Sequence, residues 1–144
     1  MPDPFSEFAT SEDAEDAFYD ALRNGDPYAV MQVWAQEDEI VCIHPNGPRL
    51  QGWNAIESSW ESILERGGIE VEALKQVCTV SGAIAVHNVI EEITIPGDQQ
   101  PEVIHCFATN VYIHDPSGWQ MVMHHSAPAG EETSVQSSAG AVLH

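Results

Sequence analysis

The chain has 144 residues, of which 43% are hydrophobic, and its 23 acidic against 4 basic side chains give a formal net charge of −19. This length and apolar content suit a single domain with a core of its own. So negative a field repels phosphate groups, which argues against binding to nucleic acid or to an acidic membrane surface. No apolar run approaches the ~20 residues of a membrane span and no signal peptide is visible, so we expect a cytoplasmic protein.

The three cysteines, Cys42, Cys78 and Cys106, lie in apolar runs that resemble strands. Their number is odd and no two of them have a CxxC spacing. We therefore expect buried, reduced thiols, and neither disulfides nor a cysteine pair that binds metal.

The N-terminal half begins with two predicted helices. Thr10 or Ser11 can cap the first helix, whose apolar residues recur at helical spacing until Asn24-Gly25 ends it. Asp26-Pro27 has the sequence of a helix start, with Asp as N-cap and Pro at the first helical position. We expect this second helix to end near Gln36.

A short strand and a third helix follow. Glu39–His44 reads as a strand that stops at a Pro-Asn-Gly-Pro turn, with Arg49–Gln51 as its hairpin partner. Asn54 and Glu57 have the spacing of a capping box, which predicts a helix that begins there and ends at Gly67-Gly68.

The C-terminal half predicts four long strands, rich in β-branched and aromatic residues. They are Ile69–Val80, Ile84–Ile95, Glu102–His114 and Trp119–Ser126. The turns that join them as hairpins are Ser81-Gly82, Pro96–Pro101 and Asp115–Gly118. This order predicts one α+β domain over residues 11–128, with three helices on one face of a curved, mostly antiparallel sheet. Residues 1–10 are expected to form a flexible arm, and residues 129–144 a disordered tail.

Strand alternation sorts the side chains of this sheet between two faces, because residues that lie opposite each other in a hairpin share a face. The inner face is predicted to collect Gln76, Cys78, His87, Glu91, Cys106, Ala108, Asn110, Tyr112, Met121, Met123 and His125. The outer face is predicted to collect Val77, Val103, His105, Phe107, Thr109, Val111, Ile113, Val122 and His124. The inner mixture of apolar and polar groups is typical of a ligand cavity, and the apolar outer set favours a dimer interface.

Several segments together resemble one known superfamily. They are Phe18-Tyr19 with Leu22 and Gly25-Asp26, Val41–Gly47, Gly52 with Ile56 and Trp60, Ala108–Tyr112, and Gly118–Ser126. In them the chain resembles the nuclear transport factor 2-like superfamily, also called the ketosteroid isomerase-like or SnoaL-like fold. The resemblance implies a cone-shaped fold with a pocket between helices and sheet, usually in a homodimer formed through the sheet's outer face. Members of this superfamily include isomerases, cyclases, dehydratases and domains that only bind.

The first candidates for chemistry lie on the middle strands. Gln76, His87 and Asn110 form a predicted polar row, in which His87 could be a general base that Asn110 orients. The alternative is a buried network that satisfies its own hydrogen bonds. Glu91 is the carboxylate on the inner face of these strands, and an apolar cavity would raise its pKa and suit it to proton abstraction beside a carbonyl. Its alternative is a solvated strand end.

Other residues are candidates for ligand binding. They are Trp34, His44, Trp60, Tyr112, Met123 and His125, with Gln76 beside them. His44 ends a strand near the expected pocket mouth, and the tryptophans lie on its helical side; for each of these a structural role is the alternative. The histidines show neither an HxxxH nor an HExxH spacing, so no metal site is predicted.

These features predict a homodimeric domain that holds a small apolar or carbonyl-bearing organic ligand. If it is an enzyme, it is a cofactor-independent isomerase, cyclase or dehydratase. His87 or Glu91 would then move a proton, and Asn110 or His125 would steady an oxyanion. The alternatives are a binding or sensor domain without turnover, and a dimerisation module whose cavity is only a packing defect.

Overall fold

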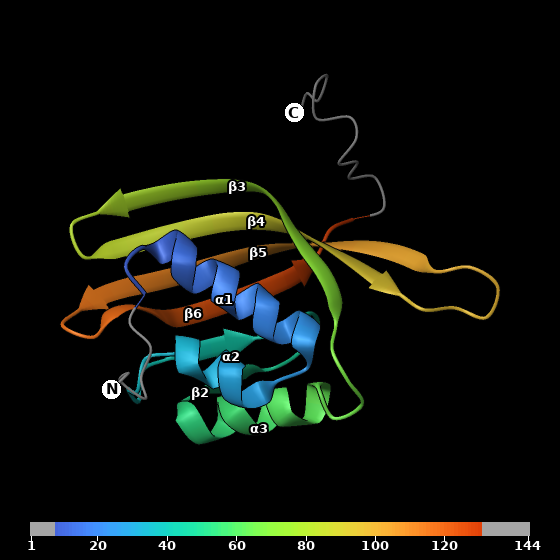
Figure 1. Cartoon of the computed structure of the whole chain (residues 1–144), viewed down its shortest axis with the longest axis horizontal. Helices are drawn as coiled ribbons and strands as arrows, with labels where there is room; N and C mark the ends of the chain where they lie inside the picture. The colour runs from blue at the N-terminus through green and yellow to red at the C-terminus, as the bar shows by residue number, and fades with distance from the viewer. Residues whose placement is uncertain (1–7, 131–144) are drawn as a thin grey trace.

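The computed structural model describes residues 8–130 as three helices packed on one face of a six-stranded sheet (Figure 1). The helices are α1 (Ser11–Asn24), α2 (Pro27–Val33) and α3 (Trp53–Ile63). The strands are β1 (Val41–Ile43), β2 (Arg49–Gln51), β3 (Glu70–Ser81), β4 (Ile84–Ile95), β5 (Glu102–Asp115) and β6 (Gly118–Pro128). Residues 1–7 of the predicted arm and residues 131–144 of the predicted tail lie outside the described residues.

The sheet has the strand order β2-β1-β6-β5-β4-β3, with every neighbouring pair antiparallel except β1 and β6. The predicted α+β class and the mostly antiparallel sheet are therefore confirmed. One end of the β4–β5 hairpin projects beyond the helices (Figure 1). No helix between residues 8 and 130 is long and apolar enough to cross a membrane.

The first two helices begin where their capping residues predict. The Thr10 hydroxyl accepts a hydrogen bond from the Asp13 amide at 3.0 Å, and the Asp26 carboxylate accepts one from the Ala29 amide at 3.1 Å. Gly25 ends α1 in the left-handed conformation, at φ 68°. Ordered structure begins slightly before the predicted boundary, because Phe8 already packs against the core.

Two helix boundaries differ from the prediction. α2 ends at Val33 and not near Gln36, because Trp34 leaves the helix to bridge β6 at Met121. α3 begins at Trp53 with Gly52 as its N-cap and without a side-chain cap, so the predicted capping box does not form. Gly52 donates its amide to the Ile40 carbonyl at 2.9 Å, which fixes the chain two residues before Asn54.

The register between β4 and β5 is as predicted, with His87 opposite Asn110 and Ile95 opposite Glu102. The β5–β6 register starts as predicted at His114 and Trp119 but shifts between Val111 and Tyr112.

This β-bulge inserts one extra residue into β6, so the side chains beyond it change face. Asn110 therefore pairs with His124, and Val111 pairs with Met123. The predicted inward placement of Met123 and His125 is wrong, as is the outward placement of His124: His124 is buried and His125 is exposed.

A second bulge, between Leu74 and Val77, changes the register of β3 against β4. Nearer the hairpin, the turn is at Gly82-Ala83, with Ser81 opposite Ile84, and not at the predicted Ser81-Gly82. His87 therefore pairs with Cys78, and the prediction that Gln76 lies opposite His87 is wrong. Cys78 is also exposed, against expectation, whereas Cys42 and Cys106 are buried as predicted.

Candidate functional site

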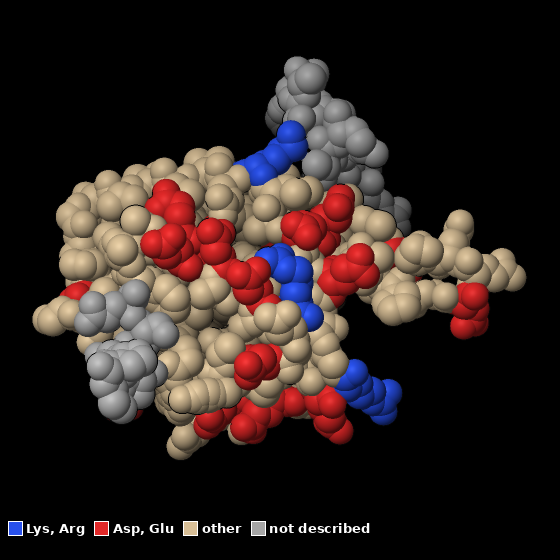
Figure 2. All heavy atoms as spheres, viewed as in Figure 1, with Lys and Arg blue, Asp and Glu red and all other residues tan. Residues whose placement is uncertain are grey.

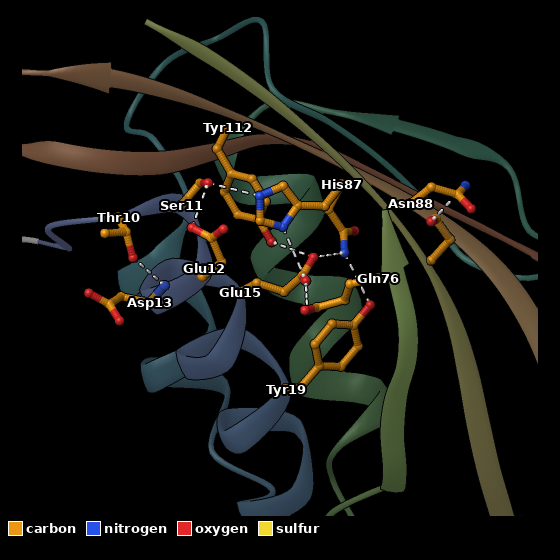
Figure 3. Close-up of polar contacts among 12 residues, drawn as sticks. Thr10, Ser11, Glu12, Asp13, Glu15, Tyr19, Gln76, His87, Asn88 and Tyr112 are labelled. Atoms are coloured by element: carbon orange, nitrogen blue, oxygen red, sulfur yellow. Dashed lines mark hydrogen bonds and ion pairs between the residues drawn. The ribbon is translucent and has the colours of Figure 1, made fainter. Parts of the chain in front are cut away.

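A fully buried carboxylate, that of Glu15 on α1, is the centre of a polar cluster between this helix and the sheet (Figure 3). Its Oε2 accepts hydrogen bonds from Asn110 Nδ2 at 2.9 Å and from the Tyr112 hydroxyl at 3.2 Å. Its Oε1 accepts a hydrogen bond from Gln76 Nε2 and lies 3.1 Å from His87 Nδ1, close enough to pair but not in good hydrogen-bond alignment. Three side chains, Gln76, Asn110 and Tyr112, therefore donate hydrogen bonds to this carboxylate.

His87 completes this Glu15 cluster at the N-terminal end of α1. Its Nε2 lies 2.8 Å from the Ser11 hydroxyl, while its Nδ1 faces Glu15 (Figure 3). The atoms follow the order of a Ser–His–acid triad. However, Ser11 is buried and Glu15 already accepts hydrogen bonds from three other side chains, so the arrangement ties α1 to the sheet.

Asn110 connects the Glu15 cluster to a second buried group. Its Nδ2 also lies 3.1 Å from the Tyr19 hydroxyl, and its Oδ1 lies 2.6 Å from Nδ1 of His124. Tyr19 in turn donates its hydroxyl proton to Glu91 Oε2 at 2.7 Å. One hydrogen-bond network therefore runs from Glu15 through Asn110 to Glu91 and His124.

Glu91 is the second buried carboxylate, and its surroundings are different. The Ser126 hydroxyl donates to Oε1 at 2.7 Å, and Tyr19 donates to Oε2. Burial raises the pKa of the Glu91 carboxyl, while the two hydroxyl donors partly offset this effect. A carboxyl with a raised pKa in a cavity is suited to accept and return a proton.

A cavity of about 220 Å³ opens beside Glu91, between α1, α3 and the sheet. Its wall is mostly apolar, and the lining residues are Leu22, His44, Pro45, Trp60, Ile63, Ile69, Val71, Glu91, Ile93, His124 and Ser126. Pro45 is exposed, which places the opening at the turn between β1 and β2.

Both histidines of the cavity wall are neutral at physiological pH. Burial lowers the pKa of His124 to about 3, and burial together with the nearby His124 lowers the pKa of His44 to about 4. His44 packs edge-on against Trp60 with 4.6 Å between ring centroids, and its Nε2 lies 2.9 Å from the Ser59 hydroxyl. These imidazoles offer the cavity hydrogen-bonding groups without positive charge.

The residues predicted from the sequence divide into four groups. Glu91, His44 and Trp60 line the cavity. The predicted row of His87, Gln76 and Asn110, with Tyr112, surrounds Glu15 under α1. Trp34 is buried in the core and is not among the cavity-lining residues. Met123 and His125 lie on the opposite face of β6.

Four residues of this network are not among the candidates predicted from the sequence: Glu15, Tyr19, His124 and Ser126. An acidic residue in the first turns of a helix is explained by the helix dipole alone, so Glu15 does not stand out in the sequence. Its spacing to Tyr19 places both on the same stripe of α1 as Leu22, and this was the available signal. His124 and Ser126 could not be found by alternation, because the bulge in β6 leaves no mark in the composition.

Within the part of the chain that the structure describes, no group of three or more His, Cys, Asp or Glu side chains could hold a metal ion. The Glu91 carboxyl and the two imidazoles of the cavity wall can form hydrogen bonds with a ligand. The face that carries the helices has many Asp and Glu side chains and few Lys and Arg side chains (Figure 2). An anionic ligand would meet a repulsive field there.

Known structures with this fold support the same architecture. A protein from Thiobacillus denitrificans, provisionally described as a calcium/calmodulin-dependent protein kinase type II association domain, is 35% identical with a TM-score of 0.78, and the match covers 86% of this chain and 98% of that one. A provisionally assigned dehydratase from Streptomyces avermitilis is 27% identical with a TM-score of 0.73, covering 81% and 91%.

A nuclear transport factor 2-like protein from Salmonella enterica is 18% identical with a TM-score of 0.71, covers 85% and 91% of the two chains, and shows the fold alone. No curated protein sequence matches this chain. Residues 12–130 match the family described as the SnoaL-like domain. The chain therefore belongs to the SnoaL-like domain family, within the nuclear transport factor 2-like superfamily.

Proposed function

We propose that this domain binds a compact, largely apolar organic molecule in the cavity beside Glu91 and acts on it by cofactor-independent acid–base chemistry. The observation that carries this proposal is a buried carboxyl of raised pKa in the wall of an apolar cavity. Apolar lining with a few convergent polar groups is the usual composition of small-molecule sites. The sequence predicts an apolar or carbonyl-bearing ligand, and the mostly apolar wall of the cavity supports a small ligand with an apolar skeleton.

In this proposal the ionised Glu91 accepts a proton from an acidic C–H or O–H group of the ligand. Tyr19 and Ser126 hold the two carboxylate oxygens and thereby fix the direction of attack. Isomerisation, cyclisation and dehydration can each begin with such a step. The dehydratase assignment of the Streptomyces protein supports this range of reactions. Asn110 is not the predicted oxyanion donor, because its amide group is already engaged with Glu15 and Tyr19.

The test compares wild-type protein with Glu91→Gln, using Glu92→Gln as the matched control. Glu92 is the next residue on β4, is half-buried, and pairs with His105. Compact organic compounds are first screened for binding by thermal shift, and those that bind are then followed in D₂O by mass spectrometry for product and for deuterium at carbon. We expect Glu91→Gln to bind without turnover and Glu92→Gln to behave as wild type. Equal turnover by Glu91→Gln would rule out the assigned base.

The same cavity could serve a binding or sensor domain that carries out no reaction. That alternative predicts a saturable thermal shift with one ligand class and no product or deuterium incorporation in the wild type. Mass action makes a true ligand visible, since about 100-fold excess over its Kd adds about 2.7 kcal/mol to stability.

A second candidate function is homodimerisation through the outer face of the sheet. Several apolar residues of this face are exposed, including Val77 at 65%, Ile84 at 51% and Phe107 at 40%. The association-domain description of the Thiobacillus protein supports self-assembly. Phe107→Glu should convert a dimer into a monomer in sedimentation velocity, whereas Tyr28→Glu, on exposed α2, should leave the mass unchanged. A wild-type monomer would exclude this interface.

A further inference from the structure

The hydrogen-bond network fixes which atom of His124 faces the cavity. Oε2 of Glu15 accepts hydrogen bonds, from the Tyr112 hydroxyl and at 2.9 Å from Asn110, so the Asn110 atom that contacts it is the Nδ2 donor. The Asn110 Oδ1 then points to His124 Nδ1 at 2.6 Å, and an amide oxygen can only accept. The proton of neutral His124 therefore resides on Nδ1, which leaves Nε2 of this cavity-lining ring as an acceptor.

The tautomer of His44 is fixed in a similar way, by Ser59, which does not line the cavity. Ser59 has one hydroxyl proton, and its shorter contact, 2.7 Å, is to the Ile56 carbonyl of the same helix. Its oxygen is then free to accept from His44 Nε2 at 2.9 Å. A neutral His44 with its proton on Nε2 has an unprotonated Nδ1, so it too offers the cavity an acceptor.

The hydroxyl donors of the cavity are already used. Tyr19 and Ser126 both direct their protons to the Glu91 carboxylate. The indole N–H of Trp60 is buried without a partner among the described residues, and its nitrogen is not accessible from the cavity. Glu91, His44 and His124 therefore present acceptors, and none of the side chains lining the cavity keeps a free donor aimed into it.

We propose that the cavity selects its ligand by the hydrogen-bond donors that the ligand carries: an uncharged, compact apolar skeleton bearing one or two hydroxyl groups, in preference to the corresponding ketone or carboxylate. This inference rests on the proposed function, because it assumes that the cavity is the ligand site. A cavity of about 150 Å³ holds the six carbons of benzene, so one of about 220 Å³ suits a ligand of about nine or ten non-hydrogen atoms. A ketone would leave the buried acceptors unpaired, and a carboxylate would also meet the repulsion of Glu91.

The test uses four ligands with one skeleton: 1-indanol, 1-indanone, indane and indane-1-carboxylate. Their Kd values for the full chain are measured by titration calorimetry near neutral pH. We expect 1-indanol to bind at least about tenfold more tightly than 1-indanone, with the carboxylate weakest, since a site built to pair one kind of polar group rejects its counterpart. Equal or tighter binding of the ketone would overturn the donor rule while the proposed function stands. If none of the four binds, the ligand site of the proposed function fails, and the donor rule fails with it.

Two further measurements test the cause of the preference. The ring ¹⁵N chemical shifts should show the Nδ1–H form for His124 and the Nε2–H form for His44, whether or not a ligand is present. Ser59→Ala frees the His44 ring to present a donor, so the alcohol preference should fall several-fold. Ser58→Ala, at the exposed neighbouring position of α3, should leave the preference unchanged. The opposite tautomer at His124, or an unchanged preference in Ser59→Ala, would contradict the assignment.

Discussion

Glu15 and Glu91 are both buried carboxylates, 0% and 4% exposed, at the two ends of one hydrogen-bond network. Glu15 accepts hydrogen bonds from three side chains and is sealed between α1 and the sheet, whereas Glu91 accepts two, from hydroxyl groups, and borders an apolar cavity. The Glu15 carboxylate thereby joins two layers of the fold. Burial raises the pKa of the Glu91 carboxyl, and its two hydroxyl donors offset that effect only in part. The two acids therefore differ in their donors and in their access to the cavity, and not in burial.

The largest effect is expected from removing the Glu15 carboxylate. Glu15→Leu leaves the buried donors of Asn110 and Tyr112 without this acceptor, which should cost roughly 1–3 kcal/mol of unfolding free energy for each unpaired donor. Urea denaturation measures this loss. Glu12→Leu, on an exposed position of the same helix turn, is the control and should change stability by less than about 0.5 kcal/mol. A loss in Glu15→Leu as small as the control's would mean that Glu15 is not a structural acid.

An intermediate effect is expected from His124, which reports on the Glu91 end of the network. Its pKa is about 3 in the folded protein and 6.5 in the reference state, so the unfolded chain binds more protons as the pH falls. The wild type should therefore lose about 2 kcal/mol of stability between pH 7 and pH 5 from this group, a loss that His124→Gln lacks. The comparison of the two pH profiles by chemical denaturation isolates this contribution. Parallel profiles would show that His124 is not held neutral by burial.

The smallest change in stability, with the largest change in function, is expected at Glu91. Burial raises the pKa of Glu91 in the folded protein, so the fold disfavours the ionised carboxylate. The protonated carboxyl therefore contributes stability at low pH, and this contribution is lost as the pH rises through the folded pKa. The wild type undergoes this loss and Glu91→Gln does not. The stability of the variant minus that of the wild type should therefore be greater at pH 8 than at pH 5. Thermal melts at the two pH values measure this difference. A variant that is destabilised most at pH 8 would place Glu91 in the same class as Glu15.

The pH dependence of turnover extends the comparison to the proposed chemistry. Because the base must be ionised, kcat/KM should rise with pH through a pKa above the ordinary glutamate value of 4.5. This rise of kcat/KM with pH is measured with any compound that the screen shows to be a substrate. The same rise should be absent from the residual activity of Glu91→Gln. A rise retained in that variant would belong to another group.

The sequence allowed the helix caps and the central register to be predicted, because Thr10, Asp26-Pro27 and the β4–β5 loop act locally. At the cavity end of the network, the sequence predicts Glu91 but not His124 or Ser126. The inward orientation of these two residues of β6 depends on the one extra residue of the bulge, which no local sequence pattern marks. Glu15 was missed for another reason: a helix charge looks the same in sequence whether it faces water or the sheet.

The bulge in β6 also has a consequence for how such a cavity can change over time. If β6 kept all its residues but paired with β5 without the bulge, alternation would turn His124 and Ser126 outward and bring Met123 and His125 to the cavity face. The cavity wall would exchange a fixed acceptor and a carboxyl-binding hydroxyl for a thioether and a ring without a partner. A change that removes the bulge, without altering any residue of the cavity wall, could therefore give a descendant of this chain a different ligand. The bulge is thus a heritable determinant of specificity in its own right.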